Sequence, residues 1–192
     1  MVLRVKAQTI ITPFLTSPPL QTTPQYSVRA FLVEANYLIR YHWGLLVGPK
    51  MEVESGRGTR YHAMERMNEA GRSQWYFEER DVTLLATSML LVRIMIGKVM
   101  KKDRIASVLH NVPIRQGEMG WNCVSWVKEA LRDLDADGKA LGTSVMGWQA
   151  VRDGAMRYVQ QKKADHRFDG KGNFDMKFAA TFDLLDGKET IP

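Results

Sequence analysis

The sequence is poor in cysteine, with Cys123 alone among 192 residues. A single thiol excludes an intramolecular disulfide and a zinc site built from several cysteines. We expect no metal and no cofactor, and we expect a reducing compartment, with the cytoplasm as the first choice. A lone cysteine in a chain that also contains histidines is also the smallest set of residues that can form a thiol nucleophile.

Long apolar runs are also missing. The longest, from Leu84 to Ile96, is interrupted by Thr87, Ser88 and Arg93, whereas a transmembrane helix needs about 20 mostly apolar residues. We therefore expect no transmembrane segment. Residues 1–33 contain no acidic residue, a weak sign of a mitochondrial transit peptide. Four prolines in the same stretch favour an irregular leader over residues 1–25, followed by one catalytic domain over residues 26–192.

The charge is unbalanced, with a net charge of +6 and a pI of about 9.5. A basic excess favours a polyanionic partner such as RNA, or an anionic membrane surface. The densest cluster contains Lys98, Lys101, Lys102 and Arg104. A solvated face near the start of a helix is the simpler explanation for that cluster.

The hydrophobic pattern predicts strands followed by helices. Strands are expected at 27–34, 41–47, 59–64 and 74–78, and the second and third form a hairpin with a long loop. Residues 90–99 fit a strand or a helix. Helices are expected at 103–110, 123–134 and 144–161, whereas the chain after Asp165 gives no assignment. This order indicates an α+β fold, a small and mostly antiparallel sheet packed with helices.

Cys123 begins the second of these helices, directly after the helix-capping residue Asn122. Free backbone N–H groups and the helix dipole favour an anion at this position. We therefore expect a lowered thiol pKa and backbone donors for an oxyanion. The polar loop from Gln116 to Trp121 is of the kind that lines a substrate groove. A cysteine that only fills space in the core is the alternative.

Two of the four histidines, His42 and His62, lie in predicted neighbouring strands. His42 shares a strand face with Gly44 and Leu46, and a polar ring among apolar neighbours needs a partner. A thiolate on an adjacent helix would be one, and His62 could orient His42 through a hydrogen bond. The alternative for each is a core histidine with satisfied hydrogen bonds. His110 and His166 fit surface or terminal positions.

Three segments together resemble a known family. They are Tyr41-His42-Trp43-Gly44-Leu45-Leu46-Val47-Gly48, Tyr61-His62-Ala63 and Asn122-Cys123-Val124-Ser125-Trp126-Val127. In content and order they resemble the lecithin:retinol acyltransferase-like proteins, a permuted branch of the papain-like cysteine hydrolases and acyltransferases. The complete chain also resembles a family of small fungal proteins without an assigned function.

The resemblance implies a permuted papain-like core in which Cys123 is the nucleophile, His42 the base and His62 the third polar member. The further candidates for substrate or oxyanion contacts are Asn122, Trp121, Trp43 and Gln116. The sequence departs from the family in a longer loop between Gly48 and Tyr61 and in lacking an apolar membrane-anchoring tail, which argues against lipid substrates.

The leading hypothesis is therefore an enzyme that transfers or hydrolyses an acyl group held as an ester, thioester or amide. The partner would be a small acyl donor or an acylated carrier. Because the chain is basic, aminoacyl-tRNA is one candidate carrier, which would make the protein a peptide-bond-forming transferase of the cyclodipeptide synthase type. The rival hypothesis is a binding protein on the same fold without chemistry, with RNA as one ligand.

Overall fold

The computed structural model describes residues 25–35 and 40–192. Apart from Gln25, the expected leader lies outside the described residues. The strands are β1 (Tyr26–Ala35), β2 (Arg40–Pro49), β3 (Arg57–Met67), β4 (Ser73–Thr83), β5 (Leu90–Val99), β6 (Leu141–Ser144), β7 (Ala180–Asp183) and β8 (Lys188–Ile191). The helices are α1 (Lys102–His110), α2 (Cys123–Asp137) and α3 (Trp148–Ala164).

The described strands form one sheet in the order β4-β3-β2-β1-β5-β7-β8, and β6 pairs with β5. All strand pairs are antiparallel except β5 with β7. The predicted α+β class and the mostly antiparallel sheet are therefore confirmed. The predicted hairpin of the second and third strands is present as β2 and β3.

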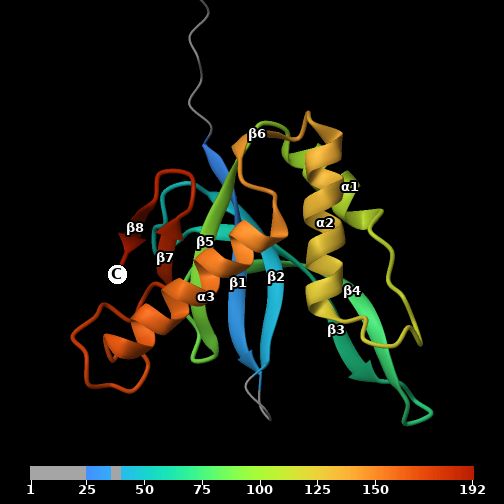
Figure 1. Cartoon of the computed structure of the whole chain (residues 1–192), viewed down its shortest axis with the longest axis horizontal. Helices are drawn as coiled ribbons and strands as arrows, with labels where there is room; N and C mark the ends of the chain where they lie inside the picture. Colours follow the sequence, from blue (N-terminus) through green and yellow to red (C-terminus); the bar gives the residue numbers. More distant parts are fainter. Residues whose placement is uncertain (1–24, 36–39) are drawn as a thin grey trace, which may run out of the picture.

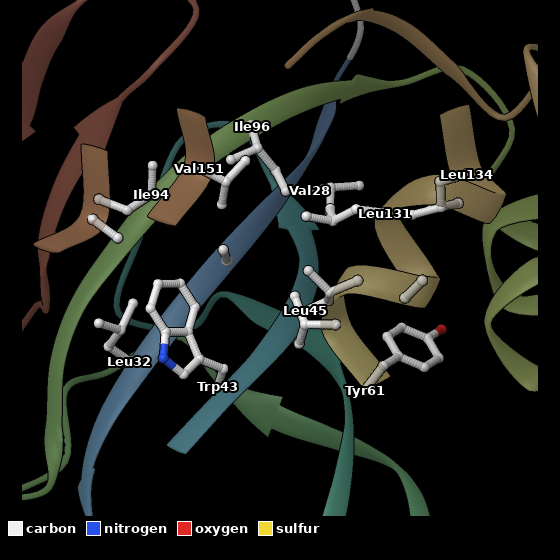
Figure 2. Packing of buried hydrophobic residues seen from close by; sticks show 14 of the residues in the cluster. Val28, Leu32, Trp43, Leu45, Tyr61, Ile94, Ile96, Leu131, Leu134 and Val151 are labelled. Atoms are coloured by element: carbon white, nitrogen blue, oxygen red, sulfur yellow. The ribbon is translucent and has the colours of Figure 1, made fainter. Parts of the chain in front are cut away.

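The core lies between one face of this sheet and helices α2 and α3, which both cross that face (Figure 1). Alternate residues of β1, β2 and β3 point toward the helices, and the residues between them in β1 and β2 are also buried, on the opposite face of the sheet. Figure 2 shows how these side chains meet the apolar side of α2 and α3. The labelled core residues are Val28, Leu32, Trp43, Leu45, Tyr61, Ile94, Ile96, Leu131, Leu134 and Val151.

The opposite face of the sheet contains buried charge. Residues 50–56, which join β2 to β3, hold Glu52 between Arg29 of β1 and Arg93 of β5. The carboxylate lies 3.3 Å from Arg29 Nε and 2.6 Å from Arg93 Nη1, and all three side chains are at most 3% exposed. The long loop noted in the sequence is therefore anchored across the sheet by ion pairs.

The structure changes or completes three assignments. Residues 90–99 form a strand. The predicted helix over 144–161 begins only at Trp148, because Leu141–Ser144 pair with Gly97 and Val99 of β5. The last part of the chain adds β7 and β8, which gave no signal in the sequence. Within the described ranges, no helix has both the length and the apolar character to cross a membrane.

Candidate active site

Three side chains form a hydrogen-bonded chain across β2, β3 and β4. His42 Nε2 lies 2.7 Å from His62 Nδ1, and His62 Nε2 lies 2.9 Å from Glu78 Oε2. The first contact is the hydrogen bond that the neighbouring strands led us to expect. Glu78 was not among the sequence-predicted site residues, and we call the three residues His42, His62 and Glu78 the relay.

The pairing of the strands explains the relay. His62 and Glu78 are directly opposite in the antiparallel pair of β3 and β4, so their side chains share a face. Gly44 leaves room for the imidazole of His62, because a Cβ at Gly44 would lie 2.9 Å from His62 Cβ and 2.5 Å from Phe31 Cζ. The ring of Phe31 then packs beside His62, with ring centroids 6.3 Å apart.

The carboxylate of Glu78 is ionised. Its burial alone would raise its pKa, but hydrogen bonds from His62 and Arg60 outweigh burial and lower the pKa to about 2. Arg60 Nη2 lies 2.5 Å from one carboxylate oxygen and Arg66 Nη2 lies 2.9 Å from the other. Glu78 is therefore a fixed acceptor at the end of the relay.

The fixed acceptor determines where the protons of the two histidines lie. Burial is the main reason that the pKa values of both imidazoles are lowered, to about 4 for His42, so both rings are neutral at pH 7. Because Glu78 only accepts, His62 Nε2 carries the proton, and its Nδ1 accepts from His42 Nε2. The remaining nitrogen, His42 Nδ1, therefore has a free lone pair and is a potential base.

Cys123 is the first residue of α2, and it is 8% exposed. Burial raises the pKa of its thiol, although the backbone N–H groups of Trp43, Val124 and Cys123 itself favour the thiolate. The expectation of a lowered thiol pKa is therefore wrong, because loss of hydration outweighs the helix terminus. The contact with the Trp43 N–H places the sulfur beside the residue that follows His42.

The side chains of His42 and Trp43 point to opposite faces of the sheet, because successive residues of a strand alternate. Trp43 belongs to the core under the helices, 5.0 Å from the ring of Trp148 between centroids. The recorded pairing of β2 with β3 ends at Leu45 and Tyr61, before His42 and Trp43 are reached. Among the described residues, no hydrogen bond joins Cys123 to His42.

The side-chain amides of Asn122 and Gln116, which we expected to contact substrate, form hydrogen bonds with the protein backbone. Asn122 Oδ1 accepts from the backbone N–H groups of Val124 and Ser125, at 2.9 and 3.4 Å. Gln116 donates to Trp75 O at 2.6 Å and accepts from Trp75 N at 3.1 Å. Both amides are thus engaged by backbone groups, one as a helix cap and the other as a link between its loop and β4.

Trp121 is also a packing residue, 6% exposed, with its ring 5.5 Å from that of Trp75 between centroids. The two remaining histidines lie at the surface, where His110 pairs with Glu79 and His166 with Asp169. In the part of the chain that the structure describes, no group of three or more histidine, cysteine or acidic side chains is arranged to hold a metal ion.

Comparison with family models gives one match, the family of unknown function DUF6914, over residues 29–191. The match covers most of the chain and includes Cys123 and all three residues of the relay, so the chain belongs to this family. Comparison with curated proteins and with solved structures gives no match.

Proposed function

We propose that this member of the DUF6914 family is a cysteine-dependent acyltransferase or acyl hydrolase on a permuted papain-like core. Cys123 is the nucleophile, His42 the base, His62 the group that orients the base, and Glu78 the anchor of His62. The relay is the single observation that carries the proposal. The relay leaves Nδ1 of His42 unprotonated. The next residue, Trp43, has a backbone N–H that favours the thiolate of Cys123.

In the first half-reaction the sulfur of Cys123 bonds to the carbonyl carbon of the donor as the thiol proton passes to His42 Nδ1. The bond to the leaving group then breaks, and the same proton goes to the departing oxygen, sulfur or nitrogen. In the second half-reaction, water or an amine loses its proton to His42 and attacks the thioester. The carbon–sulfur bond breaks and the proton returns to Cys123.

His62 and Glu78 favour the charged form of His42 that this proton transfer creates. As His42 becomes an imidazolium, its Nε2–H donates to a neutral His62, whose own Nε2–H donates to the carboxylate of Glu78. Because the thiol and the imidazole are both neutral at pH 7, the proton moves during attack and no thiolate–imidazolium pair is stored beforehand. Catalytic hydrogen bonds of this kind often tighten only when substrate binds.

Backbone N–H groups are the best candidates for the oxyanion donors. The side-chain amides of Asn122 and Gln116 are engaged elsewhere. The backbone N–H groups of Trp43 and Cys123 favour the thiolate of Cys123, and we propose that the same groups donate to an oxyanion formed on the attacked carbon.

The test is acylation of the intact protein by a phenyl thioester of acetic acid, followed by mass spectrometry. Wild type should gain one acetyl group, Cys123→Ser none, and His42→Ala should acylate about 10²- to 10⁴-fold more slowly. His62→Ala should be slowed less, because an orienting group does not transfer the proton itself. His110→Ala, which alters an exposed histidine outside the relay, is the matched control.

Two outcomes would change the assignment. If His62→Ala is far slower than His42→Ala, the roles of the two histidines are exchanged. If Cys123→Ser acylates as fast as wild type, the thiol is not the nucleophile. The second candidate function, a binding protein without chemistry, would then replace the enzyme, and the burial and raised pKa of Cys123 favour it.

A further inference from the structure

Three arginines surround the relay on the sheet face opposite the helices. Arg60 is directly opposite Arg80 in the pair of β3 and β4, one step along the same face from His62 and Glu78. Arg66 reaches the same carboxylate from farther along β3. We call Arg60, Arg66 and Arg80 the arginine cluster.

The arginine cluster carries more positive charge than its neighbours neutralise. The guanidinium groups of Arg60 and Arg66 share one carboxylate, that of Glu78. Arg80 is exposed and forms no ion pair or hydrogen bond with any described residue. Arg60 Nε is buried and lacks an acceptor. Because like charges directly opposite on neighbouring strands are destabilising, this arrangement favours binding of a further anion.

The arginine cluster lies next to the residues that would perform the chemistry. Arg60 Nη2 and His62 Nε2 lie 2.5 and 2.9 Å from the same oxygen of Glu78, which places this guanidinium beside the relay. Arg66, Glu69 and Tyr76 line a hollow of about 550 Å³ at the far end of the hairpin of β3 and β4. That end of the hairpin extends past the start of α2 in Figure 1.

We propose that the acyl donor is anionic and that its phosphate or carboxylate group binds to the arginine cluster. This inference rests on the proposed function, since it concerns the substrate of the same site. Guanidinium groups bind both kinds of anion through paired, charge-assisted hydrogen bonds. The charged group of the donor would lie at the arginine cluster, and its acyl carbon would lie toward His42 and Cys123.

The experiment compares three thioesters in the acylation of Cys123. Acetyl-coenzyme A supplies phosphates, S-succinyl-N-acetylcysteamine supplies a carboxylate, and S-acetyl-N-acetylcysteamine is neutral. We expect kcat/KM of wild type to be at least about tenfold higher for one of the anionic donors than for the neutral one. The preference should shrink as salt is added, because these side chains are partly exposed.

The double variant with Arg66→Gln and Arg80→Gln should lose most of that preference. For each variant, kcat/KM with an anionic thioester is divided by kcat/KM with the neutral thioester. A general loss of activity that arises because Glu78 loses its Arg66 partner then cancels. Arg152→Gln is the matched control, since it removes an exposed arginine on α3 and should keep the preference. Equal kcat/KM for all three donors, or a preference that survives in the double variant, would overturn the inference.

A binding measurement separates this inference from the proposed function. Inorganic pyrophosphate should shift the imidazole NMR resonances of His42 and His62 saturably in wild type, and not in the double variant. If the neutral thioester acylates Cys123 but pyrophosphate has no effect, the inference alone fails. If no thioester acylates Cys123 while pyrophosphate still binds at the arginine cluster, the proposed chemistry alone fails.

Discussion

Replacing Glu78 by glutamine tests whether the carboxylate holds the relay in place. Glutamine keeps the shape of the side chain and one acceptor oxygen, but it removes the charge that Arg60, Arg66 and His62 share. We expect the variant to unfold more easily at pH 7 and to acylate Cys123 more slowly, because His62 is no longer fixed beside His42.

The size of the effect on stability follows from the pKa of the carboxyl group. It falls from 4.5 to about 2 on folding, which at about 1.4 kcal/mol per pKa unit corresponds to about 3 kcal/mol. The side chain is 17% exposed, so solvent screening reduces the expected loss to about 2 kcal/mol. A carboxyl group with a lowered folded-state pKa stabilises above 4.5, and this contribution disappears as the pH falls toward 2.

The assay is urea unfolding of wild type and Glu78→Gln at several pH values from 7 to 3. The difference in the free energy of unfolding should be full at pH 7 and should shrink below pH 4.5. Glu54→Gln is the control, because it removes an exposed carboxylate paired with Lys177 and should cost less than about 1 kcal/mol. A Glu78→Gln deficit that equals the control, or that is unchanged at pH 3, would refute the reasoning.

Three further results are expected. Gly44→Ala should lower the free energy of unfolding by about 1–3 kcal/mol and slow acylation, because the new methyl group would displace Phe31 and His62. Urea unfolding measures the first effect and the acetylation assay the second. Iodoacetamide should modify Cys123 slowly at pH 6, and the rate of modification should still rise with pH where the rate for a free thiol has reached its plateau. Fast modification at pH 6 would contradict the raised thiol pKa. Gln116→Ala should cost about 1–2 kcal/mol and expose the loop before α2 to proteases, since it removes two hydrogen bonds to Trp75; an unchanged digestion pattern would argue against that link.

The central elements of the fold could be predicted because their signals are local. Residues 27–34 and 41–47 are short apolar, β-branched and aromatic runs that differ from β1 and β2 by at most two residues at each end. Asn122 and Gly138 mark both ends of α2, and Gly138 adopts the left-handed conformation of a helix end. Strands β6, β7 and β8 have four residues each, too few to show a period, and they form by pairing with a neighbour.

The relay could be predicted only in part. The two histidines were visible because each lies in a strand with a clear pattern. Glu78 ends the predicted strand 74–78, but its place opposite His62 depends on the register of β3 with β4, which is set by the turn between them. The thiol pKa was mispredicted for a related reason, since the sequence shows the helix terminus near Cys123 and does not show how deeply the sulfur is buried.

The proposed site draws on two faces of one sheet, and the end of the pairing between β2 and β3 is the place where these faces come nearest to a common edge. In a continuous sheet, hydrogen-bonded backbone would separate the face of His42 from the face covered by α2. Here the recorded pairing ends at Leu45 and Tyr61, and beyond that point the Trp43 N–H meets the sulfur of Cys123. The proposed chemistry therefore requires the thiol of Cys123 and the imidazole of His42 to meet at this end of the strand pair, where no backbone pairing between β2 and β3 intervenes among the described residues. Asn122 caps this end of α2, and Gln116 ties the loop before it to β4, so both side-chain amides fix the backbone around Cys123.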